Sequence, residues 1–228
     1  MSAFKNRPST PRAMDDLLRV MARLRAPGGC SWDRQQTHRS IRLHAVEEVY
    51  ELLDAIEARD DGEMAEELGD MLLQVVFHCQ LARERGAFDF EQVARHLVDK
   101  LIRRHPHVFG DSQARSIAAV WAQWDRIKRA EKTGTRHARP SALDGVPRHL
   151  PALMRAEKFV KKARKAGLIP PETGPTTSRK PTQAKLAKQL FALVEQAQKL
   201  GWCAEELLRA ETRKNERAWR KQEKKGPG

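Results

Sequence analysis

Apolar residues recur every three or four positions along most of the chain, the spacing that places them on one face of an α-helix. The first such stretch runs from Met14 to Leu24 and ends at the Pro-Gly-Gly of residues 27–29. A loop through Cys30 and Trp32 follows and is expected to end near Asp33, a suitable N-cap. The same spacing predicts helices over residues 41–58, 63–85 and 116–131, and one before Pro106, which should terminate it. Helices of this length with short connections form a bundle.

The C-terminal part repeats the helical pattern over residues 150–166 and 185–222. Between these stretches lies a Pro-rich polar segment that cannot be helical, so we expect a flexible loop over about residues 170–182. The predicted fold class is all-α. The predicted organisation is a flexible tail over residues 1–12, a helical domain over 13–136, a linker over 137–148 and a second helical part over 149–228.

Composition agrees with helices, because 40% of residues are hydrophobic, 32% are charged, and aromatic residues are few. The net charge is +13, but residues 141–228 hold 20 lysines and arginines against 9 acidic residues, so the excess belongs to the C-terminal part. This asymmetry supports one alternative function, a regulatory protein that binds polyanions through its basic C-terminal half.

The three cysteines are far apart and contain no CxxC pair, so neither a disulfide framework nor a zinc site is predicted. The N-terminal residues are not followed by an apolar stretch, and no segment approaches the roughly 20 apolar residues needed to span a membrane. We therefore expect a cytoplasmic protein that does not associate with membranes.

Five acidic residues on two consecutive predicted helices are the sharpest chemical pattern: Glu47, Glu48 and Glu51 on the first, then Glu67 and Asp70 on the second. Acids three positions apart share a helix face, so antiparallel neighbours would direct four carboxylates at one space. Such a cluster needs a hard divalent cation, and oxygen-only ligation favours magnesium or manganese over zinc. The alternative is a solvated helix face, but Asp70 interrupts an apolar stretch, where a lone surface acid would be out of place.

Three basic residues, Lys100, Arg103 and Arg104, occupy the end of the next predicted helix. Cations at a helix C-terminus ordinarily complement the helix dipole. Beside an acidic metal site, however, they would also suit a polyphosphate, whose charge the metal and the side chains neutralise together.

The chain resembles the MazG family in five motifs that occur in family order across most of residues 13–158. These are GCSWDRQQTH (29–38), EEVYE (47–51), ELGD (67–70), DKLIRRHPHVFGD (99–111) and VWAQWDRIK (120–128). Ser31 departs from the family, which usually has Pro there. The resemblance implies magnesium-dependent hydrolysis of nucleoside triphosphates to the monophosphate and pyrophosphate, including the clearing of non-standard or damaged nucleotides, by a homodimer.

The family motifs imply five catalytic carboxylates. Four of them would ligate magnesium or its substitute manganese, namely Glu48, Glu51, Glu67 and Asp70. The fifth, Glu47, would support these ligands or a water molecule. The nucleoside triphosphate would be held at its phosphates by Lys100, Arg103 and Arg104, and Trp121 would contact the nucleotide. Aromatic contacts stack on any base, so base preference stays open.

Longer family members carry two copies of this module, and the C-terminal part resembles a degenerate, truncated second copy. The helix that should carry EExxE is absent, and Lys185 and Lys188 stand where the ExxD acids belong. Ammonium groups cannot bind a cation, so we expect no second active site, only weak polyanion binding. A di-iron bundle is the enzymatic alternative, but no His has a Glu three positions before it.

Overall fold

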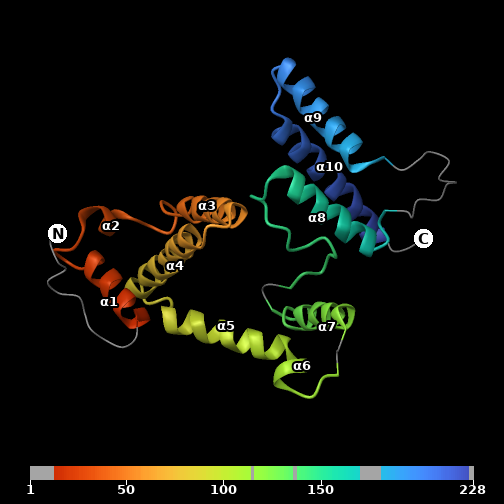
Figure 1. Ribbon diagram of the computed structural model, residues 1–228. Coiled ribbons are helices and arrows are strands. Elements are labelled where there is room, and N and C mark those ends of the chain that lie inside the picture. Colours follow the sequence, from red (N-terminus) through yellow and green to blue (C-terminus); the bar gives the residue numbers. More distant parts are fainter. Residues whose placement is uncertain (1–12, 114–115, 136–137, 170–180, 226–228) are drawn as a thin grey trace. The chain divides into compact units, whose positions relative to one another are not determined.

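The computed structural model describes residues 13–113, 116–135, 138–169 and 181–225, and every regular element in these ranges is a helix (Figure 1). This confirms the all-α prediction. The chain divides into two compact units, Met1–Val120 and Trp121–Gly228, and helix α7 (Ile117–Ala130) spans the boundary. The predicted tail over residues 1–12 and most of the predicted loop over 170–182 lie outside the described residues.

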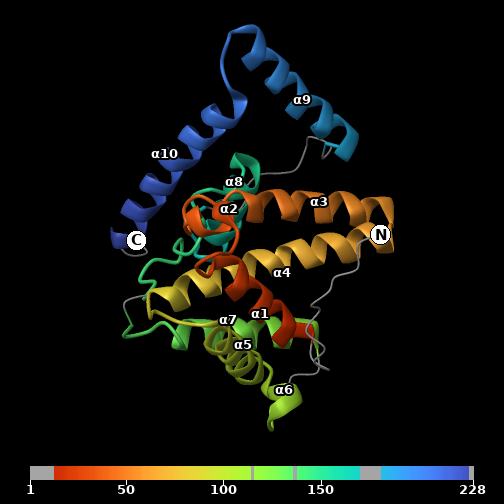
Figure 2. The same cartoon turned by 90° about the vertical axis from the view of Figure 1, so that its left-hand side faces the viewer.

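The first unit is organised around α4 (Asp61–Glu84), which packs against α1 (Ala13–Arg25), α3 (His44–Ala58) and α5 (Phe90–Arg104). α3 and α4 lie side by side as a helical hairpin (Figure 2). The turn is short because Arg59 adopts a left-handed conformation (φ 58°) that ends α3, and the Asp60 side chain accepts hydrogen bonds from the backbone N–H groups of Gly62 and Glu63.

The core of this unit joins α1 to the second half of α4. Its buried members are Met21, Ile41, Val76, Phe77 and Leu81. An ion pair between Arg25 and Glu84, with Nη2 and Oε2 2.7 Å apart, fixes the same two helices at their C-terminal ends. The first half of α4 packs against α3 instead, and the acidic residues lie on these two helical segments.

One sequence prediction in this unit needs correction, and one helix end agrees with its prediction. The segment expected to be a loop around Trp32 forms the short helix α2 (Ser31–Gln35), which places Asp33 inside the helix and makes Cys30 the N-cap. Helix α5 ends at Arg104, before Pro106, as the sequence predicts, and Pro106 then opens the short helix α6 (Pro106–Phe109). Proline is tolerated there because the first N–H groups of a helix have no partner within it.

The second unit is built on α8 (Ala152–Lys165) and α10 (Ala204–Lys225), which pack against each other. Leu143, Phe159, Ala163 and Leu168 form its buried core, with Trp219 of α10 against it. The stretch predicted as helical over residues 185–222 is divided into α9 (Gln183–Lys199) and α10 by a turn in which Gly201 has φ 72°.

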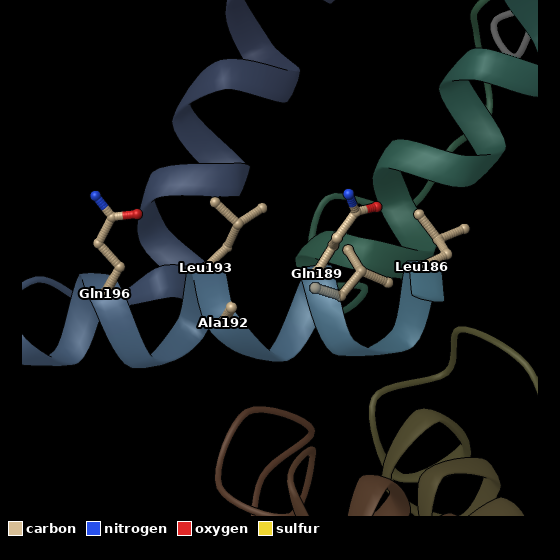
Figure 3. A pocket seen from close by; sticks show the side chains of 6 residues that line it. Leu186, Gln189, Ala192, Leu193 and Gln196 are labelled. Atoms are coloured by element: carbon tan, nitrogen blue, oxygen red, sulfur yellow. The ribbon is translucent and has the colours of Figure 1, made fainter. Parts of the chain in front are cut away.

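Helix α9 contacts α10 and leaves most of its apolar side chains exposed. Figure 3 shows Leu186, Gln189, Ala192 and Leu193 along one side of it, lining a shallow hollow without a charged residue. No helix among the described residues is long and apolar enough to cross a membrane.

Candidate active site

The α3–α4 hairpin brings together acidic residues from both of its helices. One carboxylate oxygen each from Glu48 of α3 and from Glu67 and Asp70 of α4 lie within 4.8 Å of one another. All three side chains are partly buried. Since Glu67 and Asp70 are three positions apart, they share the face of α4 that turns toward Glu48.

Glu51 belongs to the same cluster, one turn along α3 from Glu48. Burial, the charges of Glu48 and Glu47, and a hydrogen bond with Glu48 all raise the pKa of Glu51. Glu51 therefore interacts electrostatically with the other carboxyl groups. Of the four predicted ligands, Glu48, Glu67 and Asp70 form the close group, and Glu51 is coupled to them through its charge.

The charged carboxylate of Glu67 lies in an environment that disfavours its charge. Its pKa is raised by burial and by the charges of Glu51 and Asp70, and its Oε2 atom is buried without a hydrogen-bond partner. A buried carboxylate oxygen without a donor is costly, and a cation removes that cost together with the repulsion. Oxygen ligands of this number and charge suit magnesium or manganese.

Gln74 is a site residue that the sequence reasoning missed. Its Nε2 donates a hydrogen bond to Oε1 of Glu48 at 3.1 Å, which orients the Glu48 carboxylate. The signal in the sequence is spacing, since Gln74 lies four residues after Asp70 and seven after Glu67, on the same helix face.

Glu47 stands apart from this group. Its side chain is 65% exposed, and its Oε2 atom lies 3.5 Å from Nδ1 of His44 on the same helix. It acts on the cluster through its charge at Glu51 rather than as a member of the close group.

The predicted phosphate-binding residues Lys100, Arg103 and Arg104 occupy the C-terminal end of α5. In both views α6, which follows this end of α5, lies farther from the α3–α4 hairpin than α5 does, and in Figure 1 α5 diverges from the hairpin (Figures 1 and 2). Trp121 belongs to the second unit, where it is exposed and its ring packs edge-on against Trp124 at 5.5 Å.

The α3–α4 hairpin lies within a range that matches a known protein family. The MazG nucleotide pyrophosphohydrolase domain matches residues 36–109, a range that includes α3, α4 and α5. The nucleoside triphosphate pyrophosphohydrolase of Escherichia coli strain K12 is 42% identical over 92% of this chain and 87% of its own length.

Two further relatives match the chain over a shorter range. The nucleoside triphosphate pyrophosphohydrolase/pyrophosphatase MazG of Thermotoga maritima is 48% identical over 67% of this chain and 57% of its own length. The nucleoside triphosphate pyrophosphohydrolase of Mycobacterium tuberculosis is 40% identical over 67% of this chain and 45% of its own length. The chain belongs to the MazG family.

Proposed function

We propose that this protein hydrolyses nucleoside triphosphates to the monophosphate and pyrophosphate at the α3–α4 hairpin, with magnesium bound by Glu48, Glu51, Glu67 and Asp70. The observation that carries the proposal is the gathering of Glu48, Glu67 and Asp70 within 4.8 Å around a buried Glu67 oxygen that has no partner. Manganese, which accepts the same oxygen ligands, would substitute for magnesium.

Some residues of the hairpin bind the cation, and others position the attacking water molecule. Magnesium bound there would neutralise phosphate charge and lower the pKa of a water molecule. Gln74 keeps the Glu48 carboxylate in place. Glu47, exposed beside the cluster, is suited to hold the attacking water.

A second copy of the chain is needed to complete this site. α5 diverges from the α3–α4 hairpin of its own chain in Figure 1, although a triphosphate needs cationic side chains as well as metal. α3 also carries Val46, Val49, Leu53 and Ile56, each between 40% and 49% exposed. Apolar residues grouped in this way mark an interaction surface, so we propose a homodimer in which one copy presents Lys100, Arg103 and Arg104 to the other.

Measurement of pyrophosphate release tests the metal site directly. Normal and damaged nucleoside triphosphates are screened with magnesium and with excess chelator, using the parent, Glu67→Gln and, as the matched control, Glu66→Gln, whose exposed side chain lies outside the close group. We expect turnover only with magnesium or manganese, its loss in Glu67→Gln and its retention in Glu66→Gln. Full turnover in chelator would refute the metal site, and residual magnesium-dependent turnover in Glu67→Gln would reveal a second site.

Mixing two inactive variants tests the homodimer. When Glu67→Gln and Lys100→Ala chains are co-expressed, half of the dimers combine the two, and each of these contains one intact site, so about a quarter of parental activity returns. Neither variant alone should regain activity. No recovery in mixed dimers of confirmed composition, or a mass near 26.0 kDa by light scattering, would contradict the shared site.

A further inference from the structure

The second unit contains a cavity of about 470 Å³ between α8, α10 and the segment before α8. Six arginines line it, against two acidic residues, Asp144 and Glu216. The six are Arg148, Arg155, Arg209, Arg213, Arg217 and Arg220. Its volume falls within the range of small-molecule sites, and its charge excess selects for anions.

Internal ion pairs occupy only part of this positive charge. Glu216 accepts from Arg155 at 2.9 Å and from Arg220 at 3.0 Å, and Arg220 also donates to Asp144 at 2.8 Å. Both acids are therefore engaged. These ion pairs hold the side chains of the inner wall of the cavity in place.

Arg155 is the innermost of these side chains. It is 6% exposed, its guanidinium lies over the Phe159 ring at 4.9 Å, and its Nε atom is buried without a hydrogen-bond partner. A buried guanidinium that is only partly paired retains hydrogen-bonding capacity for an anion.

Three further arginines have no assigned partner. Within residues 138–169 and 181–225, the guanidinium groups of Arg148, Arg213 and Arg217 form no hydrogen bond or ion pair. Arg213 and Arg217 follow Arg209 at four-residue intervals, which places all three on one face of α10. Like charges on one helix face repel, so an anion bound beside these arginines would relieve that repulsion.

We propose that this cavity binds a compact anion carrying two or more phosphate groups, of the pyrophosphate and tripolyphosphate class. Arginine forks match phosphate oxygens in pairs, and three unpaired guanidinium groups beside Arg155 fit more than one phosphate. The cavity offers no stacking platform for bases, because Phe159 is 2% exposed, which favours a small phosphate ligand over single-stranded nucleic acid. The site is independent of the carboxylates of the α3–α4 hairpin.

Calorimetric titration of the full chain with pyrophosphate and with tripolyphosphate tests this proposal, in excess chelator so that no metal links the ligand to the hairpin. The test variant is Arg213→Gln/Arg217→Gln. The matched control is Arg164→Gln/Lys221→Gln, which removes the same charge from exposed positions of α8 and α10 outside the cavity. Melting temperatures of both variants establish that they remain folded.

We expect saturable binding of one ligand per chain, weakened about tenfold or more in the test variant and about twofold or less in the control. Glu67→Gln should bind as the parent does even though its turnover is lost, which separates this site from the proposed hydrolysis. Equal weakening in both double variants, absence of saturable binding, or tighter binding of a single-stranded oligonucleotide that displaces pyrophosphate would overturn the proposal. The last result would indicate a nucleic-acid surface instead.

Discussion

Replacing Gln74 with Leu tests how much the orientation of the Glu48 carboxylate contributes to metal binding when the charge of the site is unchanged. The substitution keeps the size of the side chain and removes the 3.1 Å hydrogen bond from Nε2 to Glu48, while all four carboxylates remain. The Oε1 atom of Gln74 is buried without a partner, so Leu also removes an unsatisfied polar group. Stability without metal should therefore stay close to that of the parent.

The size of the effect follows from the hydrogen bond that is lost. A hydrogen bond to a charged group contributes about 1.5–3 kcal/mol, which corresponds to roughly a 10- to 100-fold change in an equilibrium constant. Loss of groups that orient metal ligands typically weakens metal affinity over the same range, about 10- to 100-fold. We expect the magnesium concentration for half-maximal pyrophosphate release to rise by this factor, with kcat at saturating magnesium nearly unchanged.

Gln80→Leu is the matched control for this experiment. Gln80 also lies on α4 and donates to a carboxylate, Oε1 of Glu84 at 3.0 Å, but Glu84 pairs with Arg25 and lies outside the acidic cluster. Its magnesium dependence should match the parent. If Gln74→Leu shows the same magnesium dependence as Gln80→Leu, then Gln74 does not orient the site and the reasoning is wrong.

Three further predictions concern stability. Phe159→Ala should lower the free energy of unfolding of the second unit by about 3–5 kcal/mol in denaturant titrations, because the side chain fills its core; an effect below about 1 kcal/mol would contradict that packing. Asp60→Ala should cost about 1 kcal/mol, measured in the same way, since it removes the N-cap of α4. Burial and His38 lower the pKa of His78 in the folded protein, so the unfolded chain binds more protons as the pH falls below about 6.5 and stability declines. Melting temperatures between pH 8 and pH 5 should show this decline, and His78→Gln should reduce it.

The amino-acid sequence predicted the helices well because their apolar spacing was regular and their ends carried clear signals. The residues Asp60 and Gly201 show why some boundaries are readable and others are not. Asp60 is followed by a helix and caps it with its side chain. Gly201 lies within a long helical pattern, and only its φ of 72° shows that the chain turns there.

The candidate site was predictable to the extent that one hairpin contains it. Glu48, Glu67 and Asp70 came together, with Glu51 coupled to them by charge, because their helix faces follow from spacing and their helices are consecutive. The basic end of α5 was expected near them, but helix direction depends on packing between elements, which residue spacing does not encode. The arginine-lined cavity escaped prediction for the same reason, since it joins Asp144 and Arg155 to residues more than 50 positions further along the chain.

The two charged clusters differ in how their internal repulsion is relieved. In the hairpin, Glu51 and Glu67 have raised pKa values because their charged neighbours are acidic, so the cluster is relieved by protons or by a cation. In the second unit, Asp144 and Glu216 neutralise part of the arginine charge, and the pKa of Asp144 is lowered, with its hydrogen bond to Arg220 contributing. Because its own acids neutralise part of its charge, the arginine cavity can exist without a ligand, whereas the raised pKa values of Glu51 and Glu67 show that the acidic cluster lacks cationic side chains of its own.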